Sequence, residues 1–293
     1  MMPQHLRGHS AMLAFSMLVA GSFALGSLAA NDMEPASLNA VRFWIAAVIL
    51  CVAVVATGGL KTADVQAPWR YPFLAVFLTT YFVLMFEGLK TAPPVSAAAV
   101  FTLTPMIAGG FGWLLLRQVM TPRMAVALVI GAIGALWVIF RADFAAALRF
   151  EVGRGEAIYF WGVVAHAIYT PLVRKLNRGE SALVFSTGVV IAGAVLLTVW
   201  GWAALVATNW ADLPTIVWIT ILYTAVFASA ATFVLLQYAS LRLPSAKVMA
   251  YTYLVPSWVI VWGLALGRTP PAALVGVGVI LTLVALLLLL RED

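Results

Sequence analysis

The sequence predicts an all-α membrane protein in which ten transmembrane helices form two inverted five-helix repeats around a central cavity. Three observations predict this fold: the apolar composition, the long apolar runs that fill the chain, and an order of features that recurs in both halves. Hydrophobic residues make up 64% of the 293 residues and charged residues only 10%, whereas soluble domains carry about 25% charged residues. A mean hydropathy of +1.04 is too high for a soluble core of this size to bury, so lipid must surround the protein.

Each crossing of the bilayer core needs about 20 apolar residues in helical form. Runs of this length follow one another along the chain and leave no room for a sizeable soluble domain. The N-terminal segment is short and lacks a small-residue cleavage site, so we expect the first run to be a retained helix and not a signal peptide. The predicted spans are residues 10–30, 37–57, 71–90, 95–116, 122–140, 155–174, 181–205, 213–238, 245–266 and 271–290.

The distribution of basic residues predicts that both termini lie in the cytoplasm. In this orientation, 11 of the 17 lysines and arginines fall at the inner ends of the spans and six at the outer ends, in agreement with the positive-inside rule. The loop after the fifth span, 140–156, fits least well, because it carries three arginines and is placed outside. Since the net charge of +6 lies in short loops, we expect it to orient the protein in the membrane and not to bind nucleic acid.

An internal repeat relates the two halves. Three pairs of residues match at one fixed offset: Pro93 and Pro244, Pro105 and Pro256, and Arg117 and Arg268. Prolines also recur at helix ends for generic reasons, but the matched order favours a duplication, with one repeat in residues 1–150 and the other in 151–293. Five spans per repeat is an odd number, so the second repeat must be inverted. This arrangement is typical of secondary transporters with a substrate site between the halves.

His166 lies near the middle of the sixth predicted span, where an ionisable side chain is costly and needs a reason. By helical spacing, Tyr159, Tyr169 and Thr170 share its face. A polar and aromatic stripe therefore replaces the Leu, Val and Ile of a lipid-facing surface. We interpret His166, Tyr159 and Tyr169 as one wall of a substrate site, with the imidazole contacting a carboxylate or an amine. The alternative is a structural histidine bonded to a neighbouring helix.

Aromatic residues in three further spans extend the candidate site. Rings in a protein cavity can stack on flat substrates and can hold an ammonium group by a cation–π contact. Core packing and the interfacial belts of Tyr and Trp are the alternative explanations. The rings near the middle of their spans favour an aromatic or large neutral amino acid as substrate. The candidates are Phe77, Tyr81 and Met85 in the third span, Tyr223 and Phe227 in the eighth, and Tyr251 and Trp258 in the ninth.

Arg42 and Glu87 are the other ionisable residues placed well within predicted spans. Both fall toward the outer ends of their helices in the predicted orientation. Because an unpaired charge in the membrane is expensive, we predict that the two side chains form a structural or outer-gate ion pair. The alternative is that each side chain extends separately to the interface.

The segment TAPPVSAAAVFTLTPMIAGGFGWLLLRQVMTPRMAVALVIGAIGALWVIF, at 91–140, resembles the EamA family of the drug/metabolite transporter superfamily. The resemblance covers essentially the whole chain and is strongest to the YddG-type aromatic amino acid exporters. It implies a central cavity lined by the first, third, fourth, sixth, eighth and ninth helices, with the fifth and tenth at the periphery. The family often carries a glutamate after the fourth and ninth helices. Here those places hold Arg117-Gln118 and Gly267-Arg268, so no role is carried over from that glutamate.

Together these features predict a secondary transporter that exports amino acids, aromatic or large neutral ones favoured, across the bacterial inner membrane by alternating access. The sequence has no P-loop pattern, so nucleotide drive is not expected. No Asp or Glu lies mid-span, which favours a facilitator over proton coupling through His166. The alternatives are export of another small metabolite or drug and, less favoured, a channel or an intramembrane enzyme, which would need charged rings or a catalytic motif.

The expected partners follow from this class of protein. They are the lipid bilayer and a small-molecule substrate, which we expect to be an amino acid. We expect a monomeric, multi-pass protein that is not an enzyme and that uses no cofactor and no metal ion.

Overall fold

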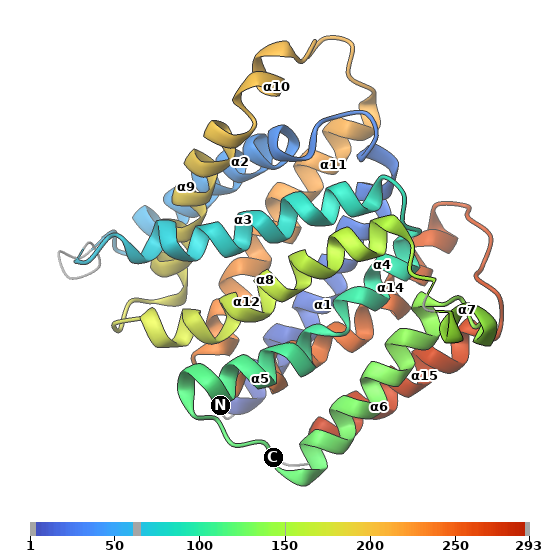
Figure 1. The fold of residues 1–293 in the computed structure, drawn as a ribbon. Coiled ribbons are helices and arrows are strands. Elements are labelled where there is room, and N and C mark those ends of the chain that lie inside the picture. Colours follow the sequence, from blue (N-terminus) through green and yellow to red (C-terminus); the bar gives the residue numbers. More distant parts are fainter. Residues whose placement is uncertain (1–3, 61–65, 150, 291–293) are drawn as a thin grey trace.

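The computed structural model describes residues 4–60, 66–149 and 151–290, which form helices joined by short loops (Figure 1). The first half contains α1 (Gln4–Ala29), α2 (Pro35–Ala56), α3 (Arg70–Leu89), α4 (Pro94–Phe101), α5 (Thr104–Leu116), α6 (Pro122–Ile139) and α7 (Phe144–Leu148). The second half contains α8 (Arg154–Leu176), α9 (Ala182–Trp200), α10 (Trp202–Ala207), α11 (Thr215–Ala225), α12 (Thr232–Ser240), α13 (Ser245–Ala250), α14 (Val255–Ala265) and α15 (Val275–Leu290). A π-helical turn, Val226–Ala231, joins α11 to α12, and a 3-10 turn, Tyr251–Leu254, joins α13 to α14.

Eight segments of the described chain are long and apolar enough to cross a membrane. They correspond to all the predicted spans except the sixth and the tenth, with α4–α5, α11–α12 and α13–α14 as the fourth, eighth and ninth spans. The sixth predicted span is α8, which has 23 residues but carries Glu156, Arg174 and Lys175 near its ends. The tenth is α15, which is apolar and has 16 residues. The prediction of an all-helical, multi-span membrane protein is therefore confirmed.

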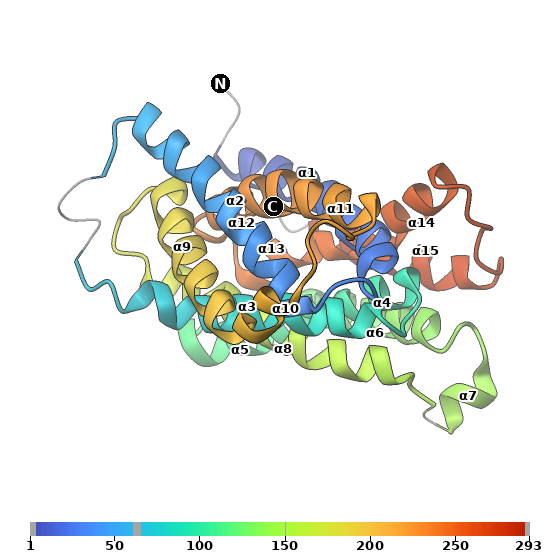
Figure 2. The same cartoon turned by 90° about the horizontal axis from the view of Figure 1, so that it is seen from above.

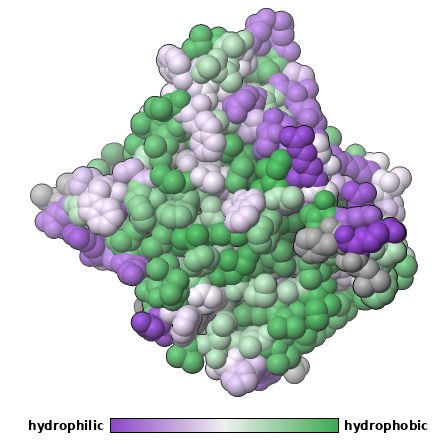
Figure 3. All heavy atoms as spheres, viewed as in Figure 1, coloured by the Kyte–Doolittle hydropathy of each residue, from purple (hydrophilic) through white to green (hydrophobic). Residues whose placement is uncertain are grey.

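The lateral surface of the bundle is apolar. Large hydrophobic side chains are exposed on helices around the molecule, among them Val48 on α2, Trp161 on α8, Val199 on α9 and Leu287 on α15. In the view of Figure 3, apolar residues form a broad area and hydrophilic residues gather at its edges. A surface of this kind is suited to contact with lipid tails, with the loops in water.

Local sequence explains where several spans begin. The first residues of α2, α4 and α6 are prolines, which have no N–H to lose at that position and a φ angle already suited to a helix. Side chains cap other free N–H groups, since Thr121 accepts from the Met124 N–H and Ser181 accepts from the Val184 N–H, both at 3.2 Å. These caps satisfy donors that a helix start leaves open.

The fourth and ninth spans are each divided in two near Pro105 and Pro256, the prolines that the internal repeat pairs. Proline lacks the N–H that would bond to the carbonyl four residues earlier. In the fourth span the Thr104 hydroxyl donates to the carbonyl of Phe101 that Pro105 leaves free. In the ninth span the 3-10 turn immediately precedes α14. Both spans, expected to be continuous, are thus discontinuous helices.

Helices of the two halves pack against each other as antiparallel pairs. Gly88 near the end of α3 lies against Gly155 near the start of α8, and Gly134 of α6 faces Gly278 of α15. In the same way α2 pairs with α9, α1 with α11 and α12, and the fourth span with the ninth. Figures 1 and 2 show α2 and α9 on one side of the bundle and α6 and α15 on the other. The remaining spans lie between these two flanks.

The loops alternate between two ends of the bundle. One end, here called the termini end, holds the start of α1, the end of α15 and the turns at 117–121, 177–181 and 241–244 (Figure 1). The opposite end, here called the distal end, holds the turns at 30–34, 90–93 and 266–274 and the short helix α7. Hydrogen bonds join neighbouring turns. At the termini end, for example, Oε1 of Gln118 accepts from the Ser245 N–H at 3.1 Å.

Candidate functional site

The polar face of α8 points to the centre of the bundle. His166 is 2% exposed, and its imidazole centroid lies 4.4 Å from the ring centroid of Tyr81 on α3 and 5.5 Å from that of Phe101 on α4. Tyr169 stacks on the imidazole with a centroid distance of 6.1 Å. The ring of Tyr159 lies 5.9 Å from that of Tyr81. Four predicted site residues, His166, Tyr169, Tyr159 and Tyr81, are therefore brought together.

Hydrogen bonds join these side chains across three helices. The Tyr159 hydroxyl donates to the Tyr81 hydroxyl at 3.2 Å, which joins α8 to α3. Gln237 on α12 donates through Nε2 to the Tyr169 hydroxyl at 3.3 Å, which joins α12 to α8. We call the set Phe23, Tyr81, Phe101, Tyr159, His166, Tyr169 and Gln237 the central cluster.

Two polar atoms of the central cluster are buried without a hydrogen-bond partner among the described residues. They are Nδ1 of His166 and Oε1 of Gln237. Buried polar atoms of this kind are few in native proteins, and each needs an explanation. The amide oxygen is an acceptor, and an imidazole nitrogen can accept or donate. The cluster can therefore offer hydrogen bonds to a polar group of a small ligand.

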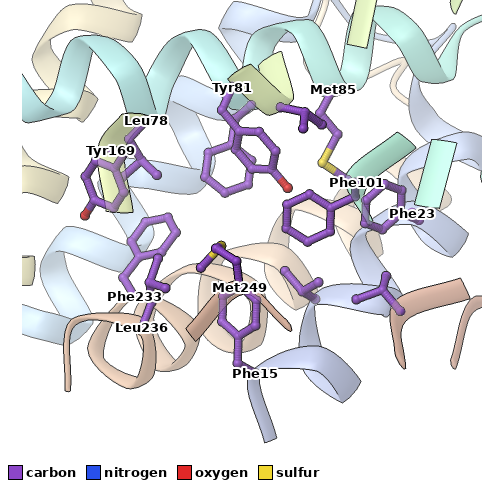
Figure 4. Packing of buried hydrophobic residues seen from close by; sticks show 14 of the residues in the cluster. Phe15, Phe23, Leu78, Tyr81, Met85, Phe101, Tyr169, Phe233, Leu236 and Met249 are labelled. Atoms are coloured by element: carbon purple, nitrogen blue, oxygen red, sulfur yellow. The ribbon is translucent and has the colours of Figure 1, made fainter. Parts of the chain in front are cut away.

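Apolar side chains fill the region where the sequence predicts a cavity. Phe23, Met85, Phe101, Phe233 and Met249 are each at most 3% exposed and pack around Tyr81 and Tyr169 (Figure 4). They come from the first, third, fourth, eighth and ninth spans, and α8 supplies the sixth. These are the six helices that the family resemblance implies as cavity-lining. In this conformation their side chains pack against one another at the centre of the bundle, and the central cavity stays a prediction.

Met85 thus lies in the core, whereas five other predicted site residues lie outside the central cluster: Phe77, Tyr223, Phe227, Tyr251 and Trp258. Phe77 is half-buried and packs against Phe73, with a centroid distance of 5.5 Å. Tyr223, Phe227 and Trp258 line a lateral groove of about 420 Å³ between α1, α11 and α14. Phe227 in this groove is 45% exposed. Tyr251 is buried near the termini end, 5.9 Å from the ring of His9.

The π-helical turn separates the face of the eighth span that carries Tyr223 and Phe227 from the buried face that carries Gln237. A π turn adds a residue to the helical repeat, so the face that carries Tyr223 and Phe227 does not continue inward. The buried face instead carries Ser229, Phe233 and Gln237, which are spaced four residues apart. Two polar residues on one helical face of a membrane span are a sequence signal that could have identified this side of the site.

The predicted ion pair between Arg42 and Glu87 is wrong. Arg42 is buried on α2 and binds α2 itself and the π-helical turn, whereas Glu87 pairs with Lys90 at 2.6 Å on the surface. Lys90 lies three residues after Glu87 on the same chain segment, so this pair forms locally. Arg42 consequently keeps its charge buried with neutral partners.

An ion pair that the sequence did not predict closes the termini end. Arg70 at the start of α3 and Glu180 in the turn before α9 form a bridge of 2.5 Å, and both side chains are buried. Arg70 also donates to the carbonyl of Leu176 at 2.6 Å. Burial works to raise the pKa of Glu180, but the hydrogen bonds from Arg70 and from the Arg178 N–H outweigh it and hold that pKa below its usual range.

Polar contacts also mark the distal end. The buried Glu156 at the start of α8 accepts from the hydroxyl of Ser96 on α4 at 2.7 Å. Two pockets of about 580 and 660 Å³ lie beside this contact, and Arg141 lines both. Within the described residues, no group of three His, Cys, Asp or Glu side chains lies close enough together to hold a metal ion.

Many apolar spans, antiparallel pairing between the halves and a buried polar cluster at the centre define a polytopic membrane transporter. The EamA-like transporter family matches residues 6–140 and again residues 153–291, so the chain belongs to this family. The resemblance to the EamA family is therefore confirmed. Membership also indicates a transporter rather than an enzyme.

Similar proteins agree with this class. The chain is 25% identical over 286 residues to an uncharacterized transporter, YyaM, of Bacillus subtilis (strain 168), and the match covers 97% of this chain and 93% of the relative. A solved crystal structure with 19% sequence identity superimposes with a TM-score of 0.74 and covers 99% of this chain and 97% of its own. At this identity the superposition shows the fold alone.

Proposed function

We propose that this transporter exports amino acids, with aromatic or large neutral ones favoured as in the YddG-type exporters, and that the central cluster is its substrate site. The observation that carries the proposal is the pair of unpartnered atoms, His166 Nδ1 and Gln237 Oε1, among aromatic rings where the two halves meet. The rings suit a flat or bulky side chain. The amide oxygen of Gln237, together with Nδ1 of His166 in the tautomer that leaves this nitrogen unprotonated, suits the ammonium group of an amino acid.

Alternating access between two inverted repeats, residues 1–150 and 151–293, is the proposed mechanism. Three observations support it: the family matches once in each half, the helix pairs between the halves are antiparallel, and Pro105 and Pro256 divide equivalent spans. Discontinuous helices at the interface of inverted repeats form the substrate sites of such transporters. Movement of one half against the other would expose the central cluster to one end at a time.

We further propose a bacterial inner-membrane location, with both termini in the cytoplasm and the protein acting as a monomeric facilitator. The orientation is supported by the basic residues, because 11 lie at the inner ends of the predicted spans and six at the outer ends. The central cluster contains no carboxylate, and a central carboxylate is what proton-coupled carriers commonly use. The substrate would therefore run down its own gradient.

Counterflow in liposomes tests this proposal. Purified protein is reconstituted into liposomes that are preloaded with single unlabelled amino acids, and uptake of a labelled aromatic amino acid is followed. We expect saturable uptake that other aromatic or large neutral amino acids compete. His166→Ala should weaken it, because the imidazole lies in the central cluster.

The matched control is Phe227→Ala, which truncates an aromatic ring on the lateral surface and should leave uptake close to the unmodified protein. Uptake that no amino acid supports, from protein shown to be folded, would refute the substrate class. A panel of other small metabolites and drugs would then be the next set of substrates. Flux that does not saturate would point to a channel.

A further inference from the structure

Arg42 is a buried cation that has only neutral partners. Its side chain on α2 is 0% exposed. The guanidinium donates to the Ser229 hydroxyl at 2.6 Å, to the Ala228 carbonyl at 2.7 Å and to Oδ1 of Asn39 at 3.2 Å. Throughout the described ranges, no carboxylate forms an ion pair with Arg42. Its positive charge is therefore uncompensated inside a membrane span.

The structural contacts of Arg42 do not need a positive charge. Its acceptors are a hydroxyl, a carbonyl and an amide oxygen, and a neutral amide side chain could donate to two of them at a lower desolvation cost. Ionisable side chains within membrane spans are costly and rare, and they mark substrate and ion pathways. A charge retained at this place indicates that an anion binds there during the transport cycle.

The guanidinium has donors left for such an anion. Of its five N–H groups, one on Nε, one on Nη1 and one on Nη2 are used. One N–H on each Nη group is therefore free. A carboxylate accepts two parallel N–H bonds from a guanidinium, and this bidentate geometry is a strong and specific one.

Arg42 is linked to the central cluster through aromatic rings. Its Cζ lies 4.0 Å from the ring centroid of Phe82. The ring of Phe82 lies 4.6 Å from that of Tyr81, which in turn lies 4.4 Å from the imidazole of His166. The rings of Phe82 and Tyr81 thus lie between the free donors of Arg42 on one side and the unpartnered atoms of His166 and Gln237 on the other. This is the arrangement that a zwitterion with an apolar side chain requires.

Two of the three hydrogen-bond partners of Arg42 lie in the π-helical turn. Ser229 and Ala228 belong to the π-helical turn, and π turns within helices occur frequently at functional sites. A carboxylate bound to the free N–H groups would share the guanidinium with this turn. Binding of an anion to Arg42 would therefore act directly on the eighth span, through the bonds of Arg42 to Ser229 and Ala228.

We propose that Arg42 binds the carboxylate of the transported substrate, so that a carboxylate is a required feature of every good substrate. This inference rests on the proposed function, because it places the ligand at the central cluster. It goes further by assigning the recognition of the anionic group to a residue on the second span, outside the cluster itself.

The first test uses the unmodified protein and compounds that differ in their charged groups, since phenylalaninamide lacks the carboxylate of phenylalanine and 3-phenylpropionate lacks its ammonium group. Phenylalanine, phenylalaninamide and 3-phenylpropionate are compared as competitors of counterflow and as stabilisers against thermal unfolding. We expect phenylalanine to act at concentrations roughly tenfold or more below phenylalaninamide, which keeps the ammonium group but lacks the carboxylate, as the loss of a buried charged hydrogen-bond partner predicts. Equal potency of acid and amide would overturn the proposal.

The second test removes the charge. Arg42→Gln should abolish the preference for acid over amide, and Arg42→Lys should restore part of it, because an ammonium keeps the charge without the bidentate geometry. The matched control is Arg242→Gln, since Arg242 donates to the Tyr238 carbonyl at the termini end and should not affect the preference. If Arg42→Gln does not fold, the acid-to-amide comparison on the unmodified protein still decides.

These outcomes separate the inference from the proposed function. Transport of amino acids with no preference for the carboxylate would refute the role of Arg42 and leave the function standing. If no amino acid binds, pairs of other organic acids and their amides are screened by thermal unfolding. An acid that stabilises more than its amide would then support Arg42 as an anion site, and a panel without any such preference would overturn it.

Discussion

Arg70 and Glu180 form a buried ion pair of 2.5 Å that ties the start of α3 to the turn between α8 and α9. At the distal end, Gly88 and Gly155 hold the same two helices in close contact. α3 and α8 carry Tyr81, Tyr159 and His166 between these two points. The pair therefore fixes the register of the helices that supply most of the candidate site.

Removing one partner of this pair should be strongly destabilising. We expect Arg70→Ala or Glu180→Ala to lower the free energy of unfolding by about 3–5 kcal/mol, because each leaves an uncompensated buried charge. The double variant should lose less than the sum of the two single losses. Thermal unfolding of the purified protein measures these changes. The control is Glu87→Ala, whose partly exposed pair with Lys90 should be worth at most about 1 kcal/mol.

The same pair makes stability depend on acid pH. Because the folded-state pKa of Glu180 is held below its usual value, its contribution is fully present above the unfolded-state pKa and is lost as the pH falls through the folded-state pKa. We expect the melting temperature to drop as the pH is lowered below the ordinary glutamate range. Glu180→Gln should remove this component, and an unchanged acid profile in that variant would contradict the assignment.

The contact between α6 and α15 should tolerate no side chain at Gly278. A Cβ there would lie 2.6 Å from the carbonyl oxygen of Gly134, whereas a Cβ on Gly276 would meet nothing within 4 Å. We expect Gly278→Ala to cost about 1–3 kcal/mol of unfolding free energy through overpacking. Gly276→Ala, two residues away on the same helix, should be neutral or stabilising by up to about 1 kcal/mol. Thermal unfolding distinguishes the two, and equal effects would disprove the close packing.

The hydroxyl pair of Tyr159 and Tyr81 should behave as one unit. Tyr81→Phe leaves the buried Tyr159 hydroxyl without its acceptor at 3.2 Å, and Tyr159→Phe removes the donor. Each should cost about 1 kcal/mol, and the double variant should cost little more than either alone. A double-mutant cycle by thermal unfolding measures the coupling. Fully additive losses would show that the bond contributes nothing.

Several features followed from the sequence because they depend on local pattern. The composition and the length of the apolar runs require lipid as solvent, and they predicted the spans that are present. The inward face of α8 was predicted from the spacing of Tyr159, His166 and Tyr169, since α8 runs as one uninterrupted helix. Pro105 and Pro256 were recognised as equivalent, but their effect on the backbone was not anticipated.

Other features depended on contacts between distant segments. Tyr223 and Phe227 were assigned to the site because they are rings near the middle of the eighth span, yet they line the lateral groove instead. Arg42 was expected to bind Glu87, yet the closest acceptors came from Ser229 and Ala228, more than 180 positions along the chain. No pattern in either segment shows that the two meet.

The sequence by itself thus determined the solvent, the helices and the family of this protein, because hydrophobicity and helical periodicity act over a few turns of one chain segment. Only the tertiary structure decided which polar side chains meet at the centre, which rings face lipid, and which side chains pack around the central cluster. Those outcomes depend on the rotation and register of packed helices. Both are set by close contacts such as Gly88 against Gly155 and Arg70 with Glu180, which join segments far apart in the chain.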